Sequence, residues 1–248
     1  MAREQFFLDN EEDTIHANPI VPTTAKEKRA NWWFYHKVHL IVGVIAVVLL
    51  GSFVYSIVSK VEPDYTISII SQTVTASDVV AKLEEELKPY ADDRNGDGQV
   101  VVHVSTYNLG SESDPQVQQA DMVRLIGDAS SFDSVLYLSD PDSFAWLQEQ
   151  DGFFTYTDGT TPKEGATDYE NMRIEWSKCK VLTGMDLSIE ALTPEQAQKY
   201  MSGLSLSVRM IEGTSFEKKQ DKMDYYQDCW ELFQRLVNGE KLETEKTE

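Results

Sequence analysis

The sequence predicts an α/β protein, with one N-terminal transmembrane helix and a single outer α/β domain that has a mostly parallel sheet of about five strands. Two observations predict this fold class. The stretch from Val38 to Ser59 contains no Asp, Glu, Lys or Arg. From Asp64 onward, short runs rich in Val, Ile, Thr and Tyr alternate with segments of helical period, which is typical of a sheet covered by helices.

The uncharged stretch predicts a membrane-spanning helix over residues 38–59. At about 1.5 Å per residue, residues 38–58 extend for about 31 Å, which matches the hydrocarbon core of a bilayer. The aromatic residues at positions 32–35 and Tyr55 are typical of side chains that anchor such a helix at the membrane surface. A cleaved signal peptide is excluded, because the stretch is too long, begins too late and is followed by no A-x-A site.

The basic residues beside this helix predict its orientation. Lys26, Lys28, Arg29 and Lys37 precede it, whereas Lys60 alone follows it closely. The positive-inside rule then places the N-terminus in the cytoplasm and the following domain outside the cell. We therefore expect a single-pass protein of the cell membrane, with the lipid bilayer as its first partner. Its expected parts are a largely disordered cytoplasmic tail (1–37), the transmembrane helix (38–59), an extracellular α/β domain (60–240) and a flexible tail (241–248).

The chain is strongly acidic, with 42 Asp and Glu against 22 Lys and Arg and a formal net charge of −20. Residues 1–37 hold six acids and five bases, so almost all of this charge belongs to the outer domain. A nucleic-acid binder needs a basic face, and such a partner is excluded. The acidic surface keeps the domain soluble or, alternatively, attracts cations or basic surface polymers.

Strands and helices are expected to alternate in the first half of the outer domain. The expected order is a strand at 65–71, a helix from Ser77 or Asp78 to about Pro89, a strand at 100–107, a helix from Pro115 to about Gly127, a strand at 134–138 and a helix from Pro141 to Gly152. Asp114 and Asp140 each precede a proline, which is the pattern of a helix N-cap followed by its first residue. The short links predict parallel pairing. On the helix from Pro115, the residues expected to face inward are Val117, Ala120, Val123 and Ile126.

The second half of the domain is less regular. Residues 157–167 are expected to form an exposed loop, and strands are expected at 178–183 and 204–211. A closing helix is expected at 221–238, because apolar residues recur there at helical spacing and Gly239 follows as a stop. Its expected apolar stripe is Met223, Tyr226, Trp230, Phe233 and Val237.

The most distinctive motif lies between the first helix and the second strand of this domain. Asp93, Asn95 and Asp97 occupy positions 1, 3 and 5 of a calcium-loop pattern, and Gln99 offers its backbone carbonyl at position 7. The pattern then fails, because Val104 stands where a bidentate Glu would be. Two interpretations stay open: a polar turn built on Asx side chains, and a weak calcium site completed by a carboxylate distant in sequence.

A second candidate site follows from the expected topology. In an open α/β sheet, ligands bind where strands end and the following helices begin. Asn108, Ser139, Asp140 and Asp142 are the polar residues expected at that edge, as a ligand rim or as ordinary helix caps. Aromatic residues around the helix from Pro141 are expected to pack in the core.

The sequence lacks the usual motifs of hydrolase and zinc chemistry. No G-x-S-x-G, H-E-x-x-H or Gly-rich phosphate loop occurs, and His103 is the single histidine of the outer domain. Cys179 and Cys229 are too few for a four-thiolate zinc site. They lie outside the cell, where they form either a disulfide or two buried thiols.

Four segments carry a resemblance to known proteins. The stretches PIVPTTAKEKRANWWFYHKVH, SKVEPDYTISII and DRNGDGQVVVHVSTY, together with the single helix, resemble a family of uncharacterised, membrane-anchored proteins from Gram-positive, clostridia-like bacteria. More distantly, residues 65–156 look like one lobe of an extracellular solute-binding protein, with SVLYLSDPDSFAWLQEQDGFF as the strand and helix that line such a lobe. The resemblance implies a lobe-like α/β fold and no particular activity.

These observations lead to one preferred hypothesis and two alternatives. The preferred one is a non-enzymatic extracellular binding or interaction domain whose partner is a membrane protein complex, a wall polymer or a small solute. The alternatives are a membrane-tethered enzyme that acts on wall glycans through a carboxylate pair, and an assembly subunit of a membrane transporter complex.

Overall fold

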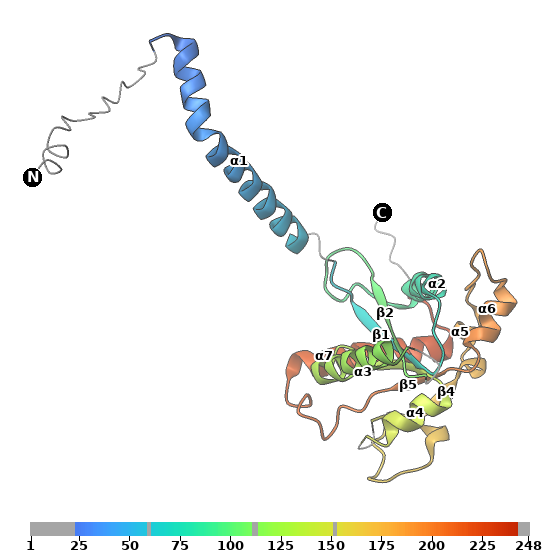
Figure 1. The fold of residues 1–248 in the computed structure, drawn as a ribbon. Helices are drawn as coiled ribbons and strands as arrows, with labels where there is room; N and C mark the ends of the chain where they lie inside the picture. The colour runs from blue at the N-terminus through green and yellow to red at the C-terminus, as the bar shows by residue number, and fades with distance from the viewer. Residues whose placement is uncertain (1–22, 59–60, 111–113, 151–152, 243–248) are drawn as a thin grey trace, which may run out of the picture. The chain divides into compact units, whose positions relative to one another are not determined.

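The computed structural model describes residues 23–58, 61–110, 114–150 and 153–242. The chain divides into two compact units, Met1–Lys60 and Val61–Glu248. The first unit contains one long helix, and the second is an α/β domain (Figure 1). Residues 1–22 of the expected cytoplasmic tail and residues 243–248 of the expected C-terminal tail lie outside the described residues.

The long helix α1 (Ala25–Val58) begins well before Val38, the expected start. Its first turn is stabilised by a reciprocal cap, in which Thr24 Oγ1 accepts a hydrogen bond from Glu27 N at 3.3 Å and Glu27 Oε2 accepts one from Thr24 N at 3.3 Å. Lys28, Arg29 and Ala30 are good helix formers, and no Gly or Pro interrupts the chain between them and the apolar stretch, so the helix continues into it. The expectation of a disordered segment up to residue 37 is therefore wrong for residues 25–37.

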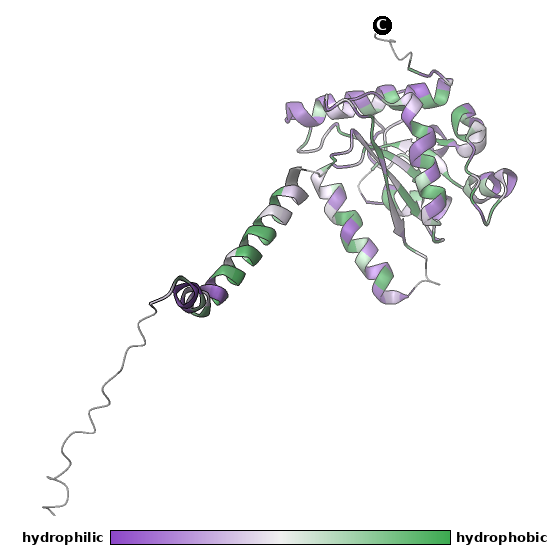
Figure 2. Cartoon of the chain, turned by 90° about the horizontal axis from the view of Figure 1, so that it is seen from above, coloured by the Kyte–Doolittle hydropathy of each residue, from purple (hydrophilic) through white to green (hydrophobic). Residues whose placement is uncertain are grey.

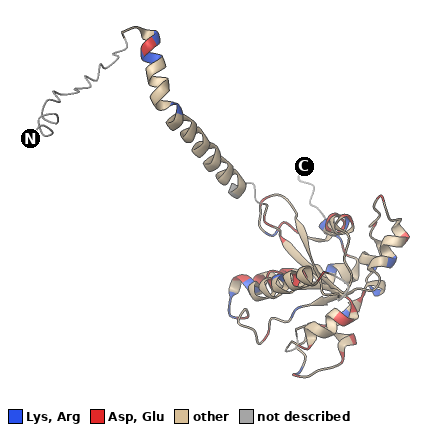
Figure 3. Ribbon diagram, viewed as in Figure 1, with Lys and Arg blue, Asp and Glu red and all other residues tan. Residues whose placement is uncertain are grey.

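α1 is long and apolar enough to cross a membrane, judged by its length and composition. Figure 2 shows its apolar residues as a continuous hydrophobic stretch, and Figure 3 shows its charged residues confined to the N-terminal part. Large apolar side chains such as Val47 and Leu50 are exposed on it. An apolar surface all around a helix is typical of a segment that lies in lipid.

The second unit contains a five-stranded sheet with the strand order β2-β1-β3-β5-β4. The strands are β1 (Tyr65–Ser71), β2 (Val102–Asn108), β3 (Leu136–Ser139), β4 (Arg173–Glu175) and β5 (Ser205–Val208). β1 pairs in parallel with β2 and with β3, while β5 pairs antiparallel with both β3 and β4. The sheet is therefore mixed, and the expected parallel pairing is found only among the first three strands.

Helices cover both faces of the sheet. They are α2 (Ser77–Leu87), α3 (Pro115–Ser131), α4 (Pro141–Gln148), α5 (Lys180–Gly184), α6 (Pro194–Met201) and α7 (Gln220–Asn238), with short 3-10 turns η2 (Lys88–Tyr90), η3 (Tyr169–Asn171) and η4 (Trp176–Lys178). One core cluster joins Ile67 and Ile69 of β1 to α2, α5, α6 and α7. The other joins Ile70 and Tyr107 to α3 and α4. Successive side chains of a strand point to opposite faces, which gives the domain its three layers.

Local chemistry fixes several helix ends as expected. Asp114 accepts a hydrogen bond from Gln116 N at the start of α3, and Asp140 accepts one from Ser143 N at the start of α4. α7 ends at Asn238 and is capped by Gly239, whose φ of 82° lies in the left-handed region that favours glycine.

α3 is turned about its axis relative to the sequence prediction. Val117, Val123 and Ile126 are exposed, whereas Leu125 is buried. The side of α3 that faces the sheet is partly polar, because Asp121 Oδ2 accepts a hydrogen bond from the backbone amide of β2 at Asn108 (3.0 Å). The expectation that Val117, Ala120, Val123 and Ile126 face inward is wrong for this reason.

Three further elements differ from the prediction. The segment expected as a strand at 178–183 forms η4 and the short helix α5 instead. β4 lies in a segment for which the sequence predicts no strand. In α7 the fully buried face is Tyr225, Cys229, Leu232, Phe233 and Leu236, while Met223, Tyr226, Trp230 and Val237 of the expected stripe are only partly buried.

Candidate functional site

The acidic turn of residues 93–99 is built on hydrogen bonds to backbone amides. The carboxylate of Asp93 accepts them from Gly96 N (2.8 Å), Asp97 N (3.2 Å) and Gly98 N (2.8 Å). Gly96 and Gly98 have φ values of 74° and 85°, which explains why glycine occupies both positions. The side chain of Asp93 therefore closes the turn around itself.

The other expected calcium ligands have similar roles. Asn95 Oδ1 accepts a hydrogen bond from Asp97 N, and Asp97 Oδ1 accepts one from Gln99 N, each at 2.8 Å. These are Asx turns, in which a side-chain oxygen binds the amide two residues later. Across the described residues, no three His, Cys, Asp or Glu side chains come together as a metal site. Calcium binding at this turn stays a prediction.

Asp64 anchors the same turn from the domain core, a role that no sequence pattern indicates. Its side chain is buried and accepts hydrogen bonds from Arg94 N (2.9 Å), Asn95 N (2.9 Å) and Val101 N (2.8 Å). Asp64 lies immediately before β1, and Val101 lies immediately before β2. Its carboxylate therefore joins the turn to the beginning of two paired strands.

The structure brings three of the four rim residues together at the carboxyl ends of the parallel strands. Ser71 at the end of β1 pairs with Asn108 at the end of β2, and Ile70 pairs with Ser139 at the end of β3. Asp140 follows Ser139 directly. Asp142 is exposed in the first turn of α4.

This rim is closed by its own hydrogen bonds. Asp140 Oδ1 accepts from Ser143 N at 2.8 Å, and its Oδ2 accepts from Gln72 N at 2.5 Å. Asn108 Oδ1 accepts from Gly110 N at 2.8 Å. A Cβ atom at Gly110 would lie 1.8 Å from Gln72 O, so the two loops are in direct backbone contact. The carboxylate of Asp140 thus links β1 to α4 and does not project into an open cavity.

The two cysteines are free and buried. Cys179 Sγ donates a hydrogen bond to Leu236 O at 3.1 Å. Burial raises the pKa of both thiols, most strongly that of Cys229. His103 is half-exposed on β2 and its Nδ1 lies 3.1 Å from Glu84 Oε1. These groups are therefore not arranged as a nucleophile and base.

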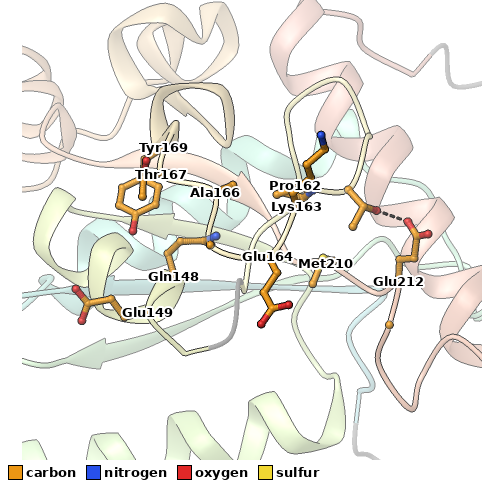
Figure 4. Close-up of a pocket in the computed structure, with 13 residues that line it drawn as sticks. Gln148, Glu149, Pro162, Lys163, Glu164, Ala166, Thr167, Tyr169, Met210 and Glu212 are labelled. Atoms are coloured by element: carbon orange, nitrogen blue, oxygen red, sulfur yellow. Dashed lines mark hydrogen bonds between the residues drawn. The ribbon is translucent and has the colours of Figure 1, made fainter.

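A cavity that no sequence motif predicts lies beside α4, with a volume of about 720 Å³ (Figure 4). We call it the α4 pocket. It is lined by Gln148, Glu149, Thr161, Pro162, Lys163, Glu164, Gly165, Ala166, Thr167, Tyr169, Met210, Glu212 and Gly213. These residues come from the end of α4, from the loop before η3 and the first residue of η3, and from the segment after β5.

Backbone hydrogen bonds hold the three segments in place. Thr155 N donates to Val208 O at 3.0 Å, and Met210 N donates to Phe153 O at 2.9 Å, so the chain after α4 runs beside the end of β5. The loop is closed at its other end, where Thr157 N donates to Asn171 O at 2.8 Å. The expected loop at 157–167 is therefore present, and it forms one wall of the α4 pocket.

The floor of the α4 pocket contains a buried amide. Gln148 is only 7% exposed. Its Oε1 accepts a hydrogen bond from Phe154 N at 3.0 Å, which fixes the orientation of the amide. Figure 4 shows the amide nitrogen directed into the pocket, and this nitrogen donates no hydrogen bond to any of the described residues.

Carboxylates dominate the charge of the α4 pocket. Glu149, Glu164 and Glu212 are exposed in it, against Lys163 as the single cation among the described residues of the lining. Thr161 Oγ1 donates a hydrogen bond to Glu212 Oε2. The pocket therefore offers a fixed hydrogen-bond donor at its floor and an excess of negative charge around it.

An aromatic cluster packs against Tyr169 of the pocket lining. The rings of Phe144 and Phe154 are stacked with their centroids 4.7 Å apart, and Tyr169 packs edge-on against Phe144 at 5.7 Å. Phe144 and Phe154 are fully buried, so the expectation that the aromatic residues near α4 pack in the core is confirmed for them. Tyr169 is half-buried and lines the pocket.

The resemblance to membrane-anchored bacterial proteins, and that of residues 65–156 to a lobe of an extracellular solute-binding protein, stays a prediction. The α4 pocket includes residues beyond that stretch, because the loop before η3 and the segment after β5 complete it. The binding properties of the α4 pocket therefore follow from its own lining residues. Comparisons with protein-family models, with curated proteins and with solved structures give no match to this chain.

Proposed function

We propose that this chain is a single-pass protein of the cell membrane whose extracellular α/β domain binds a small ligand in the α4 pocket without transforming it. The observation that carries the proposal is the Gln148 amide, which is buried, oriented by Phe154 N and directed into a cavity of about 720 Å³. Ligand sites are commonly concave, largely preformed and equipped with a few fixed polar groups.

The membrane part of the proposal is supported by α1 and its flanking charges. α1 is long and apolar enough to cross a bilayer. The basic residues of its N-terminal part are Lys26, Lys28, Arg29 and Lys37, which favour a cytoplasmic N-terminus and an extracellular domain.

The polar groups of the α4 pocket are better suited to binding than to catalysis. Among the described residues, its lining holds no Ser, His or Cys side chain. Glu149, Glu164 and Glu212 are exposed, which suits them to hydrogen bonding and charge attraction.

The test uses the full chain in lipid nanodiscs and three probes that differ in charge. The probes are N-acetyl-lysine amide, N-acetyl-glutamate amide and the N-acetylglucosamine trisaccharide. A ligand present at about 100 times its Kd adds about 2.7 kcal/mol to the stability of the folded state, which raises Tm by several degrees in a domain of this size. We expect at least one probe to raise Tm, and mass spectrometry to recover that probe unchanged.

A pocket-filling variant provides the control. Ala166 lines the α4 pocket, and Ala166→Trp places a large ring in it. The shift in Tm should disappear in this variant, whose melting without probe shows that it is folded. The proposal is wrong if no probe raises Tm of the unmodified chain, or if Ala166→Trp leaves the shift intact.

A further inference from the structure

Taking the α4 pocket as the binding site, we propose that its ligand is a small cation that carries a protonated amine and, a few bonds away, a carbonyl or hydroxyl acceptor. This inference rests on the proposed function and specifies the ligand class. It depends on three features of the pocket: its charge, its buried amide and its aromatic wall.

The charge of the pocket selects a cation. Three glutamates and one lysine line it. Among the described residues, Lys163 forms no ion pair, so it neutralises none of the three carboxylates directly. In Figure 4, Glu149 and Glu212 lie on opposite sides of the pocket, and Glu164 lies between them. The surrounding domain is also strongly acidic, so its field raises the local concentration of cations.

The Gln148 amide requires an acceptor on the ligand. Its Oε1 is already bonded to Phe154 N, which leaves Nε2 as a donor. A ligand that covers this donor without bonding to it leaves a buried polar group unpaired, and binds correspondingly weakly. A carbonyl or hydroxyl oxygen removes that cost, so a simple alkylamine is disfavoured relative to an amine that also carries an amide.

The wall of the pocket matches the remainder of such a ligand. Tyr169 is half-buried and presents part of its ring to the cavity, and Pro162, Ala166 and Met210 add apolar surface. An ammonium group is attracted to the face of an aromatic ring, and the methylene chain that carries it packs on apolar side chains. The three features together describe a lysine-like side chain attached to an amide group.

The experiment compares two probes that differ only in the ammonium group. N-acetyl-lysine amide carries the charge, and N-acetyl-norleucine amide has the same backbone without it. Binding to the full chain in nanodiscs is measured by isothermal titration at low salt. We expect the lysine probe to bind at least about tenfold more tightly than the norleucine probe, and to weaken as salt is raised, because screening reduces the attraction.

Variants locate the binding in the pocket. Glu164→Gln and Glu212→Gln each remove one charge, and Gln at position 212 keeps an acceptor for Thr161 Oγ1. We expect each to weaken binding of the lysine probe about threefold to tenfold. Glu190→Gln is the matched control, because Glu190 is exposed and lies outside the pocket lining, and it should leave the affinity unchanged.

The outcomes separate this inference from the proposed function. Equal binding of the lysine and norleucine probes, or an equal effect of Glu190→Gln and Glu212→Gln, overturns the cationic ligand class. Binding of the trisaccharide or the glutamate probe in place of the lysine probe also overturns it, while the pocket remains a binding site. If no probe binds and Ala166→Trp changes nothing, both proposals fail.

Discussion

The buried carboxylate of Asp64 accepts hydrogen bonds from three backbone amides, those of Arg94, Asn95 and Val101. Asp64→Asn replaces one oxygen by an NH₂ group, which then faces an N–H donor instead of accepting from it. We expect a loss of about 1–3 kcal/mol in the free energy of unfolding, because a buried amide is left unpaired. Urea unfolding followed by tryptophan fluorescence measures the change.

Asp97→Asn is the matched control for this prediction. Asp97 is exposed and accepts a single amide, Gln99 N. Asn at position 97 still offers an oxygen to that amide, so the stability should change by no more than about 0.5 kcal/mol. Equal losses in the two variants would show that Asp64 does not anchor the turn.

Tyr107 and Tyr226 give the domain a dependence on alkaline pH. Burial raises the pKa of each phenol, and for Tyr107 a hydrogen bond to Asp128 acts in the same direction, so that each pKa lies at about 12. In the unfolded chain a tyrosine titrates near pH 10. The two phenols therefore stay protonated to a higher pH in the folded state than in the unfolded chain. This difference stabilises the folded state fully below about pH 10, and the stabilisation is lost as pH rises toward 12.

We expect the urea midpoint to fall steadily between about pH 10 and pH 12, with phenolate absorbance appearing together with unfolding. Tyr226→Phe removes one of these groups and should make the fall less steep. A midpoint that stays constant over this range would contradict the prediction.

At the scale of the element, α3 presents an apolar surface to solvent and a partly polar surface to the sheet. Leu125 is 2% exposed, whereas Val123 is 64% exposed. We expect Leu125→Ala to cost about 2–4 kcal/mol, because it leaves a cavity in the core. Val123→Ala should change stability by no more than about 0.5 kcal/mol. If calorimetry finds the reverse order, the orientation of α3 is wrong.

The elements that could be predicted from the sequence are those that local chemistry determines. The Asp-Pro pairs at 114–115 and 140–141 and the glycine at 239 mark helix ends without reference to the rest of the chain. The strand β1 is apolar enough to be recognised by composition. Hydrogen bonding to distant strands determines the rest, as in the antiparallel position of β5 between β3 and β4.

Polar contacts also explain why a prediction from the spacing of apolar residues can be wrong. In α3 the spacing of Val117, Val123 and Ile126 indicates an inner face, but Asp121 and Asp128 bond to β2 and turn that stripe outward. No local pattern shows which polar residue will find such a partner.

The two candidate sites also differ in how far the sequence predicts them. The rim residues Asn108, Ser139 and Asp140 lie at one edge of the sheet because parallel strands end together, which follows from the expected parallel pairing. The α4 pocket has no such signature, since its walls come from segments around residues 148, 165 and 212 that carry no motif. Its one sequence signal is the exposed loop expected at 157–167.

At the scale of the whole molecule, the distribution of charge predicts how the chain is placed in a membrane. The basic residues before the apolar part of α1 favour the cytoplasmic side, and the strongly acidic second unit is expected outside. Labelling with a membrane-impermeant maleimide tests this arrangement. The native thiols of Cys179 and Cys229 should not react with the maleimide, because both are buried and their pKa values are raised.

Two introduced cysteines report the two sides of the membrane. Ser130→Cys lies on the exposed surface of α3, and Thr14→Cys lies in the segment that precedes α1. In intact cells we expect labelling of Ser130→Cys and none of Thr14→Cys, which should react only after the cells are permeabilised. The opposite pattern would invert the topology and place the α4 pocket in the cytoplasm. Labelling of both cysteine variants in intact cells would show that α1 does not cross the membrane. The control is the unmodified chain, which must stay unlabelled.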